Sequence, residues 1–190
     1  MLCRLGGRPY DEAWSYGAYE GTLRSLVHLL KYERIPTLAE PLGALLARAL
    51  PRDRRFDVIV PVPMHWRRRW MRGFNQAELL AAEVARRTGM PVAKILSRES
   101  RPVQAGLSSA ERRRNAAGAF AARRLDAVAG SRVLLVDDVL TTGSTVAACA
   151  RVLKRAGAVR VSVLTLARAD RRFGREALIG PQLAARGMSA

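Results

Sequence analysis

The sequence predicts an α/β fold in which a mainly parallel sheet is flanked by helices, and three neighbouring segments carry this prediction. Residues 133–136 (Val-Leu-Leu-Val) form an unbroken apolar run, typical of a parallel strand covered on both faces. A helix is expected over residues 144–156, where Gly157 is a natural terminator, and a second strand over residues 159–166. A strand, a helix and a strand in this order form a right-handed unit with parallel pairing.

Two more helices are expected in the first third of the chain. Apolar residues recur at helical spacing within residues 19–33, which indicates an amphipathic helix. Pro36 interrupts this pattern, and residues 38–50 resume it as a second helix that Pro51 closes. Residues 1–18 carry only a weak pattern.

A further strand is expected over residues 57–63. It begins with β-branched residues, and Pro61 and Pro63 then end its hydrogen-bonded ladder. The two prolines indicate a stiff turn, and we expect its backbone amides to face an anion.

Residues 65–72 (His-Trp-Arg-Arg-Arg-Trp-Met-Arg) follow this turn directly. The sequence alone leaves two interpretations open, a solvated loop or a segment that contacts a ligand or nucleic acid, and the position after the turn favours the second. Asn75 is a suitable N-cap for a helix that runs through Arg87, with Glu78 three positions further on.

The composition indicates one folded domain. The chain has 190 residues, of which 49% are hydrophobic, and this is enough for a substantial core. Because the sequence shows no apolar run of membrane-spanning length and no secretory leader, we expect neither a membrane span nor export. Two cysteines cannot build a disulfide framework, so the simplest expectation is a cytoplasmic location.

The chain is strongly basic, with 33 Lys+Arg against 16 Asp+Glu and a formal net charge of +17. Such a surface attracts polyanions. The basic residues are spread along the chain, however, so the charge alone predicts no specific nucleic-acid sequence.

Two acidic residues and a polar loop follow the central strand. Asp137 and Asp138 are expected at its carboxyl end, where open α/β sheets bind ligands. The loop after them supplies hydroxyls and free amides at the start of a helix, which together suit a phosphate group. The carboxylates accept hydrogen bonds from sugar hydroxyls or hold magnesium, so the implied ligand is a sugar phosphate. The loop residues are Thr141, Thr142, Gly143, Ser144 and Thr145.

This stretch resembles the phosphoribosyl diphosphate signature of type I phosphoribosyltransferases. The resemblance implies the type I phosphoribosyltransferase fold, with Asp137 and Asp138 facing the ribose 2′- and 3′-hydroxyls and residues 141–145 wrapping the 5-phosphate. It also implies that Mg²⁺ arrives with phosphoribosyl diphosphate and not in a protein-only metal site. The loop expected to grip the diphosphate comprises Val60, Pro61, Val62, Pro63 and Met64.

Over residues 2–168 the chain resembles the ComF family of competence-related proteins. The most family-specific element is Arg-Gly-Phe-Asn-Gln at residues 72–76, and the pair Lys-Tyr at 31–32 and Gln-Ala-Gly-Leu-Ser at 104–108 are others. The amino-terminal zinc ribbon of that family is expected to be absent or incomplete here, because Gly6 stands where a cysteine would be expected after Cys3. By resemblance, candidate site contacts are Arg67, Arg72, Asn75, Gln76, Gln104, Arg112 and Asn115.

The expected organisation is a remnant segment over residues 1–18, a phosphoribosyltransferase-like domain over 19–168 and a tail over 169–190. Within the domain, residues 94–124 lack sustained periodicity, and the fold class implies that they form a flexible hood that closes over the site.

Three functions remain open at this point. The preferred one is a ComF-type protein that binds phosphoribosyl diphosphate and acts in DNA uptake or processing, with single-stranded DNA and competence-machinery proteins as expected partners. The second is a nucleobase salvage transferase, although Thr141 stands where hypoxanthine–guanine phosphoribosyltransferases carry an aspartate. The third is a non-catalytic DNA-handling module that keeps the pocket as a sensor. No general base is apparent.

Overall fold

The computed structural model describes residues 9–98, 120–122 and 125–169. Within them, four strands form the central sheet in the order β1 (Glu12–Ala18), β6 (Arg160–Arg168), β5 (Arg132–Leu140) and β2 (Val58–Pro61). Each strand is parallel to its neighbours. The predicted α/β fold with a mainly parallel sheet is therefore confirmed.

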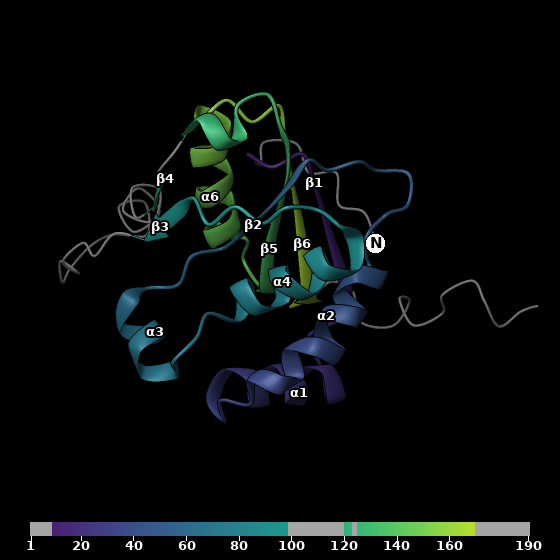
Figure 1. Ribbon diagram of the computed structural model, residues 1–190. Coiled ribbons are helices and arrows are strands. Elements are labelled where there is room, and N and C mark those ends of the chain that lie inside the picture. Colours follow the sequence, from purple (N-terminus) through teal and green to yellow (C-terminus); the bar gives the residue numbers. More distant parts are fainter. Residues whose placement is uncertain (1–8, 99–119, 123–124, 170–190) are drawn as a thin grey trace, which may run out of the picture.

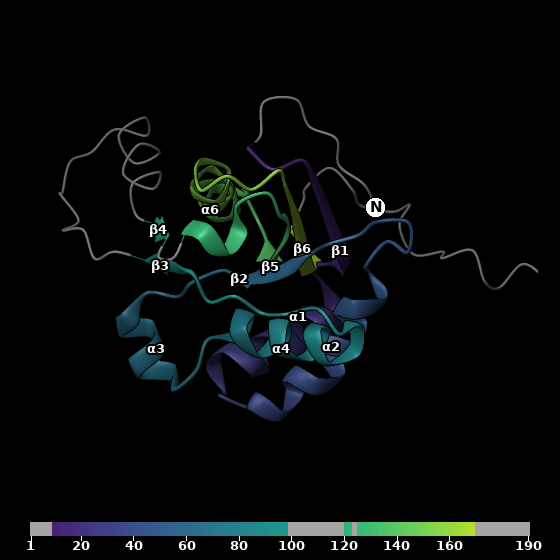
Figure 2. The same ribbon diagram turned by 45° about the horizontal axis from the view of Figure 1, so that its top comes forward.

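Helices cover both faces of this sheet. α6 (Ser144–Arg155) packs on one face, and α1 (Gly21–Tyr32), α2 (Ala39–Arg48) and α4 (Gln76–Thr88) pack on the other (Figures 1 and 2). These four helices lie where the sequence predicts them. Two short 3-10 helices, η1 (Pro36–Leu38) and η2 (Leu125–Val128), belong to the connections.

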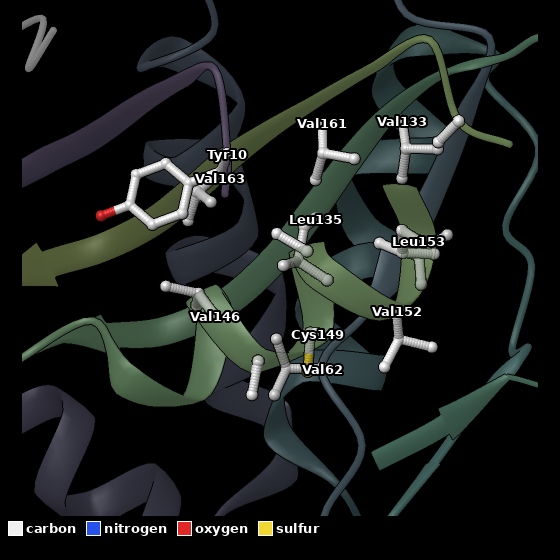
Figure 3. Close-up of a cluster of buried hydrophobic side chains, with 14 of the residues drawn as sticks. Tyr10, Val62, Val133, Leu135, Val146, Cys149, Val152, Leu153, Val161 and Val163 are labelled. Carbon is white, nitrogen blue, oxygen red and sulfur yellow. The ribbon is translucent and has the colours of Figure 1, made fainter. Parts of the chain in front are cut away.

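The core on the α6 face is built from alternate residues of the two central strands. Leu135 of β5 and Val163 of β6 point toward Val146 and Cys149 of α6, as Figure 3 shows. Cys149 is fully buried, which confirms that it packs in the core, and burial raises the pKa of its thiol far above the ordinary range. On the opposite face, the intervening residues of β5 and β6 meet Leu30 of α1, and leucines of α2 and α4 complete that core.

Two strand boundaries differ from the sequence-based expectation. Residues 12–18, expected to be weakly patterned, form β1 and pair with β6, so a domain boundary at residue 19 would remove a strand from the sheet. β5 does not end at Val136 but continues to Leu140, because Asp137 and Val139 still pair with β6.

The basic segment after β2 forms a helix, α3 (Trp66–Arg72), so its interpretation as a loop is wrong. His65 caps this helix, because its Nδ1 accepts a hydrogen bond from the Arg67 amide at 3.3 Å. Gly73, at φ 83°, ends it in the left-handed region, and its amide donates to the Arg69 carbonyl.

The segment predicted as a hood begins and ends in a small antiparallel pair, β3 (Leu96–Arg98) with β4 (Phe120–Ala122). Gln104, Arg112 and Asn115 lie outside the described residues. Among the helices of the described part, none combines the length and apolarity needed to cross a bilayer.

Candidate active site

The acidic pair occupies the sixth and seventh of the nine residues of β5, toward the carboxyl edge of the sheet. Asp137 is aligned with Thr165 of β6, and its charge contributes to the raised pKa of Cys149 on α6. Asp138 extends to the opposite face, where α1 lies, because it contacts a side chain of that helix. The two carboxylates therefore point to opposite faces of the sheet, as successive side chains of a strand do.

Asp138 forms an ion pair with Lys31 from the last turn of α1. Its Oδ1 lies 2.8 Å from the Lys31 Nζ, and the two side chains are only 13% and 17% exposed. The sequence marks Lys31 only through the family resemblance of the Lys31-Tyr32 pair and predicts no role for it, since no local spacing relates it to the acidic pair.

Asp137 is an unusual carboxyl group. Burial raises its pKa to about 7, and the adjacent charge of Asp138 adds to the rise. Its Oδ1 accepts a hydrogen bond from the Asp138 amide at 2.9 Å, and this bond and the Lys31 charge oppose the rise without cancelling it. Near neutral pH the Asp137 carboxyl can therefore exchange a proton as well as accept hydrogen bonds.

The loop that follows β5 leaves backbone amides available. Gly143 has φ 75°, a conformation that favours glycine, and it directly precedes α6. The Ser144 amide donates to Thr142 Oγ1 at 3.4 Å, and the two hydroxyls lie 3.0 Å apart. Within the part of the chain that the structure describes, no acceptor is bonded to the amides of Thr142, Gly143 or Thr145. Free amides at the start of a helix suit an anion.

The loop expected to grip the diphosphate is tied to the fold at Val62. The Val62 amide donates to the Val136 carbonyl at 2.9 Å, and its carbonyl accepts from Asn75 Nδ2 at 3.0 Å. Pro61 and Pro63 have no amide hydrogen. The Met64 amide is thus the one at the end of this loop that has no acceptor among the described residues.

Asn75 and Gln76 are buried where α4 begins. Asn75 caps the helix as predicted, since its Oδ1 accepts from the Ala77 amide at 3.1 Å. Its contacts hold the loop of Val62 against α4, which positions that loop. Gln76 is 1% exposed, and its Nε2 has no partner in the described part of the chain.

The two arginines predicted as site contacts stack on aromatic rings of the protein. The Arg67 guanidinium lies 5.3 Å from the centre of the Trp66 ring, and the Arg72 guanidinium lies 5.0 Å from that of Tyr32. Tyr32 directly follows Lys31, so Arg72 connects α3 to the part of α1 that reaches Asp138.

The donor set suits a metal that arrives with its ligand. Among the described residues, no group of three or more His, Cys, Asp or Glu side chains could hold a metal ion by itself. Asp137 and Asp138 are hard oxygen donors of the kind that magnesium prefers, but Lys31 already neutralises Asp138. These residues fit Mg²⁺ best when phosphate oxygens supply most of its coordination.

Comparison with known proteins agrees with this geometry. The family model described as a phosphoribosyl transferase domain matches residues 74–178, more than half of the chain. Together with the parallel sheet and the acidic pair at its carboxyl edge, this match defines the class of the protein as one with a phosphoribosyltransferase domain.

Relatives narrow the class further. The chain is 39% identical over 169 residues to DNA utilization protein YhgH of Salmonella typhi and 37% identical to that of Escherichia coli strain K12, covering 84% of this chain and 73% of each relative. It is 34% identical to Competence protein F of Haemophilus influenzae, covering 84% and 74%. The chain belongs to the ComF family, which confirms the resemblance noted from its motifs.

Solved structures with a similar arrangement include adenine phosphoribosyltransferase from Thermoanaerobacter pseudethanolicus, at 24% identity and a TM-score of 0.47, covering 72% of this chain and 71% of that one. An allosteric regulatory enzyme of purine biosynthesis is 26% identical with a TM-score of 0.49 over 67% of this chain. The matched region spans only 25% of that longer chain.

Proposed function

We propose that the protein binds magnesium phosphoribosyl diphosphate at the carboxyl edge of β5 and acts as a phosphoribosyltransferase-type protein in the utilisation of DNA. The observation that carries the binding proposal is the set of free amides at Thr142, Gly143 and Thr145, directly after two carboxylates. The DNA-related role extends to this chain the words in the names of its relatives, DNA utilization protein and Competence protein F.

The roles of the residues follow from their chemistry. Residues 141–145 would hold the 5-phosphate through their amides and hydroxyls, while Asp137 and Asp138 would accept hydrogen bonds from the ribose hydroxyls. The Met64 amide would meet the diphosphate. Magnesium bound with the diphosphate would neutralise charge on that leaving group.

The reaction class is displacement at the ribose C1. A nitrogen of the acceptor forms a bond to C1, and the bond from C1 to the diphosphate oxygen breaks with its electron pair leaving on the diphosphate. The proton that the acceptor nitrogen loses passes to water or to the released diphosphate. The protein would accelerate this step by fixing the ribose and by meeting charge that develops on C1 and the leaving group.

Calorimetry with magnesium phosphoribosyl diphosphate tests the proposal. We expect the wild type to bind and Asp138→Asn to lose at least tenfold in affinity. Asp57→Asn is a matched control, because Asp57 lies at the opposite end of the sheet, where it pairs with Arg132 at 2.6 Å. No binding by the wild type, or equal binding by Asp138→Asn, would refute the assignment. Measuring diphosphate release with a panel of bases then separates nucleobase salvage from the other functions.

A further inference from the structure

α3 presents an unusual surface for so short a helix. Trp70 is 85% exposed, Met71 61% and Trp66 57%, and Arg67 and Arg68 are exposed beside them. Large apolar side chains that are exposed together on one element mark an interaction site, whereas single exposed apolar residues are common on any protein surface. In both views of the fold, α3 lies apart from the helices that cover the sheet (Figures 1 and 2).

The two sides of α3 have different roles. With 3.6 residues per turn, Trp66, Arg67, Trp70 and Met71 share one side, and Arg69 and Arg72 lie on the other. Arg68 lies at the border between the two sides, and its side chain is exposed. The second side is bound to the body of the protein: Arg69 Nη1 pairs with Glu78 of α4 at 2.6 Å, and Arg72 stacks on Tyr32 of α1. These contacts orient the first side outward.

In the ion pair between Arg69 and Glu78, the Glu78 carboxyl is ionised. Although burial opposes it, the hydrogen bond from Lys94 and the charge of Arg69 keep the pKa of Glu78 below its ordinary value. Arg69 is therefore partly neutralised, whereas Arg67 and Arg68 have no acidic partner among the described residues. The outward side thus combines uncompensated positive charge with aromatic faces.

We propose that the outward side of α3 is a docking surface for single-stranded nucleic acid, with a base stacked on Trp70 and phosphates bound by Arg67 and, at the border of that side, by Arg68. Aromatic faces interleaved with cations match the two repeating features of a single strand, its unstacked bases and its phosphates. Duplex DNA offers the phosphates but keeps its bases stacked inside, so Trp70 would have nothing to stack on.

This inference rests on the proposed role in DNA utilisation. It deepens that role by naming the surface that binds the nucleic acid and by specifying that the nucleic acid is single-stranded. The helix that carries this surface is connected to the candidate active site through its other side, because Arg72 stacks on Tyr32, the neighbour of Lys31, which pairs with Asp138.

The test is fluorescence anisotropy with a labelled oligo-dT of about 20 nucleotides, since a site of this kind covers about 4–16 nucleotides. We expect Trp70→Ala to weaken binding about 5- to 140-fold, the range for removal of one stacked base. We expect the double variant Arg67→Ala/Arg68→Ala to reduce the slope of log affinity against log salt by about 0.7 for each phosphate that the variant no longer neutralises.

The matched control variants remove the same kinds of side chain, one aromatic residue or two arginines, at positions outside α3. Tyr16→Ala removes a half-exposed aromatic side chain from β1, and Arg52→Ala/Arg55→Ala removes two exposed arginines from the connection before β2. We expect both to bind the oligonucleotide within about twofold of the wild type, because a side chain outside the docking surface contributes little to affinity.

Several outcomes would overturn the proposal: no binding by the wild type, equal losses in the controls, a duplex that competes as well as the single strand, or binding to anionic vesicles in place of the oligonucleotide. The proposed function fails separately, because Trp70→Ala should still bind magnesium phosphoribosyl diphosphate like the wild type. If Trp70→Ala loses oligonucleotide binding while neither the wild type nor any variant binds phosphoribosyl diphosphate, the docking surface on α3 is supported and the proposed sugar-phosphate site is rejected.

Discussion

Lys31 and Asp138 form an ion pair across the candidate active site, with 2.8 Å between the Lys31 Nζ and the Asp138 Oδ1. The two residues come from different layers of the fold, α1 and the sheet. Because both side chains are mostly buried, the pair attaches α1 to the carboxyl edge of β5. It also places a cation where a ribose or a metal ion would approach Asp138.

Lys31→Met should destabilise the protein by about 1–3 kcal/mol, because it leaves the Asp138 carboxylate buried without its partner. The same change should raise the pKa of Asp137 further, since Lys31 now lowers it. Urea unfolding measures the first effect, and carboxyl-carbon NMR titration measures the second.

Lys94→Met is the control for this substitution. Lys94 also pairs with a glutamate at 2.8 Å, yet its side chain is 63% exposed. Because exposed ion pairs contribute little, the loss should stay below about 1 kcal/mol. Equal losses in the two variants would mean that the Lys31 pair is no more buried in solution than a surface pair.

Asp137→Asn should change how stability depends on pH. The folded-state pKa of about 7 lies above the ordinary value of 3.8, so the folded protein holds a proton that the unfolded chain releases between about pH 4 and 7. Asp137 therefore makes the wild type less stable as pH rises through this window.

The asparagine keeps an acceptor for the Asp138 amide but cannot ionise. We expect it to match the wild type near pH 4 and to exceed it at pH 8 by at least about 1 kcal/mol, roughly one pKa unit. Urea unfolding at the two pH values measures the difference. A difference that is the same at both would contradict the raised pKa.

The elements predicted from the sequence are those whose pattern is local. The buried strand at 133–136, the helix that ends before Gly157 and the helix capped by Asn75 each carry their signal within a few residues. The acidic pair and the loop after it could be assigned for the same reason, since they form one continuous stretch. Their chemistry follows directly from the residue types.

The features that the sequence did not predict depend on distant partners. β1 contains Glu12, Ser15 and Gly17 and has no clear alternation, so its strand conformation comes from pairing with β6. α3 buries no side chain, so no core-facing apolar stripe predicts it, and only His65 and Gly73 mark its ends. The contact of Lys31 with Asp138 joins positions more than a hundred residues apart, and no periodicity relates them.

Gly43→Ala should destabilise the protein, because α2 and α4 are in close contact at Gly43. An added Cβ at Gly43 would overlap the Cβ of Glu83, and backbone movement is needed to relieve that clash. The expected loss is about 1–3 kcal/mol by urea unfolding, with a larger loss for Gly43→Val. Unchanged stability in both variants would show that the two helices lie further apart in solution.

Gly143→Ala should weaken phosphate binding as well as stability. Gly143 has φ 75°, so a side chain there strains the loop whose amides face the proposed phosphate. Gly89→Ala is a matched control, because Gly89 has φ 73° at the end of α4, far along the chain from that loop. Both variants should lose about 1 kcal/mol of stability, since the backbone strain is the same. Only Gly143→Ala should lose affinity for ribose 5-phosphate in calorimetry, and equal affinities in the two variants would mean that the loop does not bind the phosphate.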